Sequence, residues 1–462
     1  MDIDGRRSGT SRMRGGRRTG AVVLVVLAVL SSACGGGSDA DPAADGGGKQ
    51  DATESGEIDF AEIGLWDDGA CDKSKPPLVV GTSTVFESPV ISLGDLATAL
   101  EAAATAFNER GGANGSCIEV HTCDDGANAD QSVDCVRQLD ENGIVATVND
   151  TTTAGNAEVA AALTAAGIPR VATNVSPSDW DAANAFALDA SSTGSALLMP
   201  KALLEEGVEE IGVIRADLAQ ASALQGILAG MYEDDGASFP MDAAVPSGTT
   251  DYTQFILKAD EAGVDGVMLA VGEQEAVQVV NAAKQLGSSL MVSATLGTFP
   301  SESVAEFGDF AEQMAFLSSF PPATFDLPVY EALRADLAAS GEESLQPESL
   351  KSSPMRSWIG LYALVRMIRD SGMTEFTREG ITAMLQEAKD VPMLDMFGGE
   401  NWTPALEHPG SFKRAGMNHW SVFSWDPEAE NPVGDAGNFV ESATFDWDEV
   451  VCGSPFGAPE PC

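Results

Sequence analysis

From Leu78 onward the chain alternates between short apolar runs and longer stretches whose apolar residues recur at helical spacing. The run from Leu78 to Gly81 is typical of a buried strand, and the stretch from Leu93 to Phe107 predicts a helix that ends at Gly111-Gly112. The pattern continues with strands at 118–123, 144–148 and 170–173, then 211–215, 241–245, 266–271 and 290–294, and with helices at 130–140, 155–166, 222–233, 251–262 and 273–286. Alternating strands and helices joined by short turns favour parallel sheets with helices on both faces. Two such series predict an α/β fold of two doubly wound parallel-sheet lobes.

The loops that follow the predicted strands are the expected place for function, because ligands of doubly wound sheets bind beyond the carboxyl ends of the strands. These loops come after Gly81, Asn149, Thr173, Arg215, Val271 and Thr295.

The first 33 residues have the form of a signal peptide. Six arginines precede the apolar run from Ala21 to Leu30, and small residues lead to Cys34. The run is about half of the roughly 20 residues that span a bilayer, so a retained membrane helix is not expected. The position of Cys34 resembles the lipobox of bacterial lipoproteins, although Ser31 stands where that motif usually has leucine. An ordinary signal peptide with an incidental cysteine is the alternative, and the arginine pairs lack the surroundings of a twin-arginine signal.

Residues 34–60 are predicted to form a flexible, lipid-anchored tether. Between Gly35 and Ser55 the chain is mostly Gly, Asp, Ala and Ser, which cannot bury a core. The predicted location is therefore extracytoplasmic, with the protein anchored to the outer face of the cell membrane as a lipoprotein.

The chain is strongly acidic, with a formal net charge of −46 at pH 7. Such a surface repels nucleic acid and anionic headgroups, so nucleic acid is not expected as a partner and membrane contact is expected only through the lipid anchor. The acidity also causes a self-repulsion that salt screens. It fits either a salty habitat or a general solubility device.

The cysteines other than Cys34 number six, an even count that favours three disulfides in an exported protein. Closeness in the predicted fold favours the pairs Cys71–Cys117, Cys123–Cys135 and Cys452–Cys462. A metal site is the alternative, but His121, His408 and His419 have no ligand spacing with the cysteines. We therefore expect no metal and no other cofactor.

Four stretches of sequence carry a family resemblance. They are Val80-Gly81-Thr82-Ser83, Ala106 to Gly112, Asp124-Asp125, and the block from Asp251-Tyr252-Thr253-Gln254-Phe255 to Ala262-Gly263-Val264-Asp265-Gly266-Val267. In this order and spacing the chain, from about Leu78 to Trp425, resembles the type I periplasmic binding proteins of the branched-chain amino acid (Leu/Ile/Val-binding) class. These proteins are the solute-binding subunits of ABC importers.

The resemblance implies a division of the chain into lobes joined by hinge segments near 191, 318 and 422. The implied lobes are 76–191 plus 319–421 and 192–318 plus 422–451, followed by a disulfide-closed tail at 452–462. The resemblance also implies a monomer that carries a small-molecule ligand to ABC permease subunits.

On the first lobe, the resemblance implies a ligand site made of hydroxyls and backbone amides. The implied residues are Thr82 and Ser83 after the first strand, Thr151 and Thr152 in the run Thr151-Thr152-Thr153, and Asn174 and Ser176. Hydroxyls and amides at helix N-termini can hold a carboxylate. The alternative is that these side chains only cap helices.

On the second lobe, the positions that match the family are Gln220, Gly272 and Leu296, with Asp217 and Glu273 close by. The family tends to place aromatic and acidic residues there, and none of the three matching positions has one. This leaves the ligand open between an amino acid, an amide, a small hydroxylated acid and a larger molecule, with weak binding of leucine, isoleucine and valine expected.

The expected function is solute binding rather than catalysis. The chain has no G-x-S-x-G, P-loop or H-E-x-x-H motif. A surface sensor of the same fold and a hydrolase without a recognisable motif are the alternatives. His408 and His419 are interpreted as polar loop or hinge residues. The tryptophans Trp402, Trp420 and Trp425 are interpreted as core and hinge packing.

Overall fold

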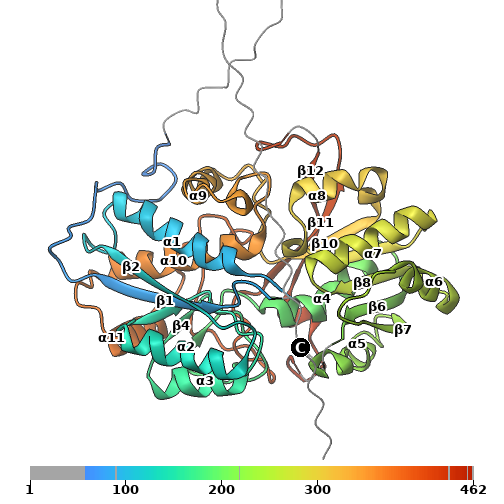
Figure 1. Cartoon of the computed structure of the whole chain (residues 1–462), viewed down its shortest axis with the longest axis horizontal. Coiled ribbons are helices and arrows are strands. Elements are labelled where there is room, and N and C mark those ends of the chain that lie inside the picture. The colour runs from blue at the N-terminus through green and yellow to red at the C-terminus, as the bar shows by residue number, and fades with distance from the viewer. Residues whose placement is uncertain (1–57, 89–90, 218, 435–436, 455, 460–462) are drawn as a thin grey trace, which may run out of the picture. The chain divides into compact units, whose positions relative to one another are not determined.

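The computed structural model describes residues 58–88, 91–217, 219–434, 437–454 and 456–459. The predicted signal peptide, Cys34, most of the predicted tether and Cys462 lie outside the described residues. The described chain forms two β-sheets, each covered by helices (Figure 1).

The first sheet has five parallel strands in the order β2-β1-β3-β4-β5. The strands are β1 Leu78–Thr84, β2 Ile118–Asp124, β3 Ala146–Val148, β4 Arg170–Val171 and β5 Ala185–Phe186. One face packs against α1 (Gly94–Glu109), α9 (Pro328–Ala338) and α10 (Ser352–Ser371), and the other against α2 (Ala129–Glu141) and α3 (Asn156–Ala165). A further helix, α11 (Arg378–Glu387), contacts α10. Because both faces are covered, β1 and β3 are buried over nearly their whole length, whereas β2 at the edge of the sheet is partly exposed.

The second sheet has seven strands in the order β12-β11-β10-β9-β8-β6-β7. The strands are β6 Glu210–Ala216, β7 Ser238–Val245, β8 Gly266–Ala270, β9 Met291–Thr295, β10 Met314–Ser318, β11 His419–Asp426 and β12 Asn438–Asp446. The helices α4 (Ser191–Glu205) and α5 (Leu224–Met231) pack on one face. The other face is covered by α6 (Thr253–Ala262), α7 (Glu273–Leu286) and α8 (Ser301–Glu306).

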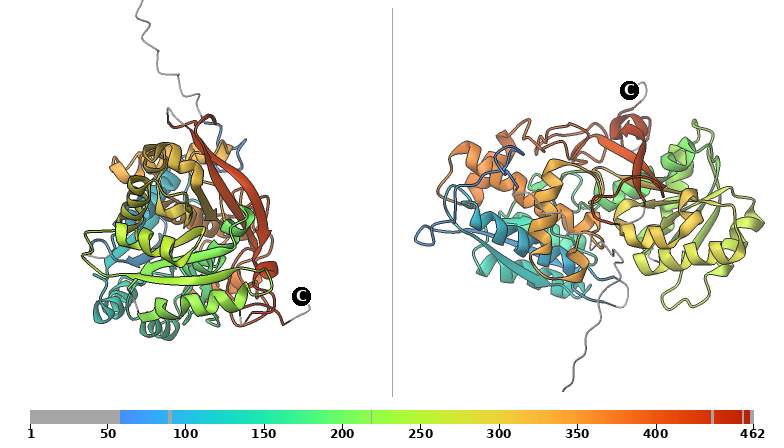
Figure 2. Two further views of the ribbon diagram at one scale, coloured as in Figure 1. Left: turned by 90° about the vertical axis from the view of Figure 1, so that its right-hand side faces the viewer. Right: turned by 90° about the horizontal axis from the view of Figure 1, so that it is seen from above.

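The prediction of two doubly wound parallel-sheet lobes is confirmed, although the second sheet also has an antiparallel edge. The strands from β7 to β10 are parallel, whereas β11 pairs antiparallel with β10 and β12 pairs antiparallel with β11. Figure 2 shows this red hairpin along the edge of the sheet. The reason is the route of the chain: β11 arrives from the five-stranded half, and the chain then reverses into β12. An antiparallel pair at one edge of a parallel sheet is common in large sheets.

Most predicted elements are confirmed, with shifts at their ends. The strand predicted at 170–173 stops at Val171, and β5, which has only two residues, was not predicted. The helix predicted at 222–233 begins as a 3-10 turn, η1 (Ala219–Ala223), before α5. A two-residue strand has no periodicity that a sequence could reveal.

The chain passes between the two sheets at three places, which are the connection from β5 to α4, the end of β10 and the start of β11. The last of these strands begins at His419, near the hinge position expected at 422. The bounds of the two lobes stay a prediction.

Two predicted disulfides are confirmed. Cys71 and Cys117 have Cα atoms 5.1 Å apart, and Cys123 and Cys135 have Cα atoms 5.6 Å apart. The first bond ties the segment before β1 to the residue before β2, and the second ties the end of β2 to α2. Cys452 is also disulfide-bonded, and its predicted partner lies outside the described residues.

No helix in the described part of the chain is both long enough and apolar enough to cross a membrane.

Candidate ligand-binding site

A cavity lies between the two sheets, where the loops after β3, β4, β9 and β10 meet the first turns of α4 and α10. Its volume is about 130 Å³, slightly less than the 150 Å³ or so of an apolar cavity that holds a benzene molecule. The lining residues are Leu93, Leu96, Asn149, Thr151, Asn174, Asp189, Ser191, Ser192, Ser195, Thr295, Gly297, Leu317, Ser318, Ser319, Phe320, Ser352, Ser353, Arg356 and Trp420. The space suits a small molecule with about the bulk of one ring.

Nine of these lining residues are serines or threonines, contributed by both halves of the molecule. Each hydroxyl can donate one hydrogen bond and accept others, so such a wall can pair with many polar ligand groups. Five larger apolar side chains complete the lining, namely those of Leu93, Leu96, Leu317, Phe320 and Trp420. The cavity therefore combines a polar wall with apolar surface for a small hydrocarbon part.

Three lining residues carry a buried polar atom that has no hydrogen-bond partner within the described protein. The atoms are Oγ1 of Thr151, Oγ of Ser352 and Nε1 of Trp420. A buried polar group without a partner costs about 1–3 kcal/mol, and such groups are uncommon in folded proteins. A ligand that offers hydrogen bonds to them would recover this cost on binding.

The charged side chains among the lining residues are Asp189 and Arg356, and they form one ion pair. Nη1 and Nη2 of Arg356 each donate to one oxygen of Asp189, both at 2.8 Å, and the hydroxyl of Ser319 donates to the same carboxylate. The Asp189 side chain is fully buried. Burial alone would raise the pKa of Asp189, but the charge and hydrogen bonds of Arg356 and the bond from Ser319 hold it below its ordinary value. The pair is thus ionised at neutral pH.

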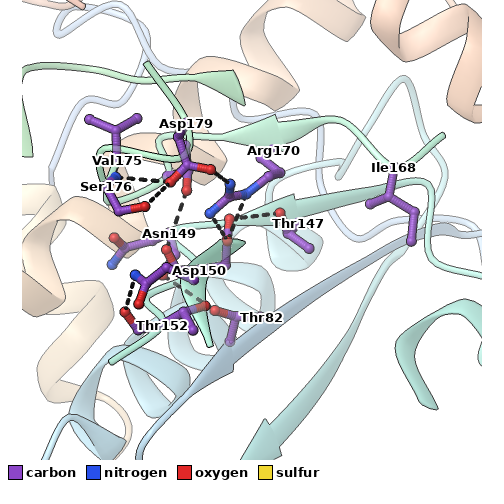
Figure 3. Close-up of polar contacts among 12 residues, drawn as sticks. Thr82, Thr147, Asn149, Asp150, Thr152, Ile168, Arg170, Val175, Ser176 and Asp179 are labelled. Atoms are coloured by element: carbon purple, nitrogen blue, oxygen red, sulfur yellow. Dashed lines mark hydrogen bonds and ion pairs between the residues drawn. The ribbon is translucent and has the colours of Figure 1, made fainter. Parts of the chain in front are cut away.

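The loops after β3 and β4 are fixed by a buried cluster around Arg170 (Figure 3). Nε and Nη2 of Arg170 donate to Asp150 at 2.9 and 2.7 Å, and Nη1 donates to Asp179. Burial alone would lower the pKa of Arg170, but the two carboxylates outweigh it and raise the pKa. Asp150 lies next to Thr151 in the loop after β3, and Asp179 lies in the same loop as Asn174 after β4. By binding both carboxylates, Arg170 joins these two loops of the cavity wall.

Of the residues predicted on the first lobe, Thr151 and Asn174 line the cavity. The others have neighbours within the protein. Oγ1 of Thr82 donates to the Asn149 carbonyl at 3.4 Å, and the Ser83 carbonyl accepts from the Thr151 amide.

Thr152 and Ser176 also stand outside the cavity lining. The hydroxyl of Thr152 is buried without a partner. That of Ser176 donates to Asp179 at 2.7 Å (Figure 3). The Ser176 hydroxyl is therefore used within its own loop, which favours the alternative that it has a structural role rather than a contact with the ligand.

The positions predicted on the second lobe are not among the cavity-lining residues that the structure describes. Gly272 precedes the first residue of α7, Leu296 packs in the core of the seven-stranded sheet, and Gln220 lies in η1. Asp217 is exposed after β6, and Glu273 forms an ion pair with Lys351.

The seven-stranded half instead contributes to the cavity through Thr295, Gly297, Leu317, Ser318 and Trp420. A Cβ atom at Gly297 would lie 3.3 Å from Oγ of Ser353, so the glycine allows a close approach of this loop to α10. Trp420 packs in a core of the seven-stranded half, as predicted, and also lines the cavity.

The central pair of the cavity could not be found from the sequence. Asp189 follows β5, a strand that the sequence does not reveal, and Arg356 lies in α10, a helix of mostly buried residues. Thr151, Asn174 and Thr295 were identifiable because each follows a strand that the pattern predicted.

The remaining candidate residues have structural partners. Nδ1 of His408 lies 3.1 Å from Asp448 and Nε2 lies 2.6 Å from the Gly416 carbonyl, while His419 contacts the Ser421 hydroxyl. Trp402 and Trp425 pack in the cores. Within the described ranges no group of three or more His, Cys, Asp or Glu side chains is placed to hold a metal ion.

The sequence pattern of the periplasmic binding proteins matches residues 77–414, most of the chain. The chain belongs to the periplasmic binding protein family. The resemblance to its type I, branched-chain amino acid class is confirmed. A comparison with curated proteins found no sequence match.

Three solved structures illustrate the fold of this periplasmic binding protein. One is the solute-binding protein of an ABC transporter from R. palustris in complex with 4-hydroxybenzoate, with a TM-score of 0.64 and 14% identity over 80% of this chain and 97% of that chain. Another is a fatty acid ABC transporter substrate-binding protein from Thermomonospora curvata, with a TM-score of 0.65 and 15% identity over 81% and 93%. The third is a leucine-, isoleucine-, valine-, threonine- and alanine-binding protein from Brucella ovis, with a TM-score of 0.64 and 15% identity over 84% and 98%. At these identities the likeness shows the fold.

Proposed function

We propose that this protein is the extracytoplasmic solute-binding subunit of an ABC importer and that it binds one small polar ligand in the cavity between the two sheets. The observation that carries the proposal is a cavity of ligand size in which three lining residues, Thr151, Ser352 and Trp420, each carry a buried polar atom without a partner in the described protein. The family supports ligand binding, and the similar solved structures include an ABC transporter protein in complex with 4-hydroxybenzoate, a fatty acid ABC transporter protein and an amino-acid-binding protein.

Binding in this site requires no catalysed reaction. Affinity comes from pairing each polar ligand group in a place that excludes water, since an unpaired buried group costs about 1–3 kcal/mol. The lining contains more hydroxyls than aliphatic side chains, which disfavours leucine, isoleucine and valine as ligands.

A thermal-shift screen of the mature protein tests the proposal. The compounds are amino acids, amides, polyols and small organic acids. A true ligand raises the melting temperature by mass action, with about 2.7 kcal/mol of added stability at a concentration 100 times Kd. Calorimetry on the hits should give one site per chain. A screen in which no compound raises the melting temperature, or in which every hit still binds after Trp420→Ala and Thr151→Val, would contradict ligand binding in this cavity.

The location is part of the proposal and rests on Cys34, which lies outside the described residues. We expect the wild-type protein to partition with membranes and Cys34→Ser to release it as a soluble form. Recovery of most wild-type protein as an unlipidated soluble species would contradict the lipid anchor while leaving the ligand site untouched.

A further inference from the structure

We propose that the cavity selects an uncharged ligand and disfavours a carboxylate of the same shape. This inference rests on the proposed function, because it takes the cavity as the ligand site. An uncharged ligand differs from the ligands of the similar solved structures, which are 4-hydroxybenzoate, fatty acids and amino acids.

The cation in the cavity wall already has its counter-ion. Both terminal nitrogens of Arg356 donate to Asp189 at 2.8 Å. Asp189 is fully buried and also accepts a hydrogen bond from Ser319, so its displacement would break these bonds. A ligand carboxylate would have to displace Asp189 or be buried without a matching charge, and burying an unmatched charge is costly.

The N-terminus of α4, which could otherwise attract an anion, already holds a carboxylate, and the cation beside the N-terminus of α10 is paired with acids. The amide of Ser191, the first residue of α4, donates to Oδ1 of Asp189 at 2.8 Å. Next to the start of α10, Nζ of Lys351 lies 3.0 Å from Glu273 and 3.7 Å from Asp95.

The formal charges around the cavity therefore leave no positive surplus. Two cations, Arg356 and Lys351, stand against three carboxylates, those of Asp189, Asp95 and Glu273. The net charge of −46 on the whole chain further lowers the local concentration of anions.

Among the residues that line the cavity, the buried polar groups without a partner in the described part of the chain are neutral. They are the hydroxyls of Thr151 and Ser352 and the indole N–H of Trp420. A hydroxyl gives and takes hydrogen bonds, and an indole N–H only donates. An amide or an alcohol can satisfy all three groups without bringing a charge into the cavity.

The test compares matched pairs of ligands that differ in charge but hardly in shape. Two pairs are 4-hydroxybenzamide with 4-hydroxybenzoate and isobutyramide with isobutyrate, run with every other amide and acid pair of the screen at pH 7.5. We expect the amides to bind at least about tenfold more tightly than the acids by calorimetry. Equal or tighter binding of the acids would overturn this inference and leave the proposed function standing. If no member of any pair and no other compound of the screen binds, both proposals fail.

Two variants locate the origin of the selectivity. Asp189→Asn removes the counter-ion of Arg356 and keeps the size of the side chain, so the preference should shift toward the acids by at least about tenfold. Asp336→Asn is the matched control, because Asp336 forms a buried ion pair with Arg110 that is not part of the cavity wall. We expect Asp336→Asn to keep the wild-type preference. An unchanged preference in folded Asp189→Asn would contradict the role of the ion pair. The wild-type comparison stands even if neither variant folds.

Discussion

The ammonium group of Lys351 connects the two halves of the molecule by lying 3.0 Å from Oε2 of Glu273 and 3.7 Å from Oδ2 of Asp95. Asp95 is in the first turn of α1, on the five-stranded sheet, whereas Glu273 begins α7, on the seven-stranded sheet. The Ser349 hydroxyl also donates a hydrogen bond across the two halves, to Oε1 of Glu302 at 2.8 Å. Both contacts oppose separation of the two sheets, and Lys351 directly precedes Ser352 of the cavity lining.

Loss of the Glu273 contact should speed ligand release more than it affects folding. Glu273 is 40% exposed, so its ion pair contributes at most about 1 kcal/mol. For Glu273→Gln we expect a ligand dissociation rate raised by up to about fivefold and an almost unchanged melting temperature. Glu275→Gln, on the same helical turn and without an ion pair to Lys351, is the control. Stopped-flow release measurements that give equal rates for both variants would exclude a contact that resists opening.

Removal of Lys351 should be more damaging because it leaves Asp95 unpaired. The Asp95 side chain is 11% exposed and its Oδ1 has no hydrogen-bond partner among the described residues. Burial raises the pKa of Asp95 even though Lys351 opposes the rise. We expect Lys351→Met to lower the free energy of unfolding by about 2–3 kcal/mol. The double variant Lys351→Met with Asp95→Asn should recover part of this loss in urea denaturation.

Replacement of the Thr151 hydroxyl should affect stability and affinity in opposite directions. Thr151→Val removes a buried hydroxyl that has no partner in the described protein, so the ligand-free protein should be as stable as wild type or more stable. Affinity for the best ligand of the screen should fall by about 1–3 kcal/mol, because one hydrogen bond to the ligand is lost.

The control for this prediction is Thr324→Val. The Thr324 hydroxyl is also buried without a partner, but it lies in a separate small pocket with Phe299 and Phe439. We expect the same effect on stability and no loss of affinity. An equal loss of affinity in both variants would show that the effect is not due to contact with the ligand.

His408 should make stability depend on pH near neutrality. Burial alone would lower the pKa of His408, but Asp448 and the Gly416 carbonyl outweigh it and raise the pKa above 6.5. Since the folded-state pKa is the higher one, the stabilisation is complete below the unfolded-state pKa and is lost as pH rises through the folded-state pKa. The stability advantage of wild type over His408→Gln should therefore be larger at pH 5.5 than at pH 8.5. Urea denaturation at both values, with His121→Gln as the control, checks the sign.

The two disulfides should stabilise the protein to different extents. Cys71–Cys117 closes a sequence separation of 46 residues and Cys123–Cys135 one of 12. The loop-entropy estimate gives about 4 kcal/mol for the longer loop and about 3 kcal/mol for the shorter. We expect replacement of both Cys71 and Cys117 by serine to lower the free energy of unfolding more than replacement of both Cys123 and Cys135. Denaturant unfolding of the two double variants measures the difference. The reverse order would mean that strain or residual structure outweighs chain entropy.

Local sequence pattern determined the elements of this fold and much of their order. Apolar periodicity predicted β1, α1 and the helices and strands of the second series. It could do so because the residues on the buried face of an element recur in the sequence at a fixed spacing. The two disulfides were also predictable, since each pair lies next to strands that the pattern had placed. The family resemblance rested on such local blocks as well.

Tertiary structure alone decided the core of the site. Asp189 and Arg356 are 167 residues apart in sequence, and they meet only because the chain returns from the seven-stranded sheet before α10. Trp420 enters the cavity wall because β11 crosses back and pairs antiparallel with β10. Periodicity reports which side of an element is buried but not which distant element covers it. The charge balance of the cavity is therefore a property of the chain crossings.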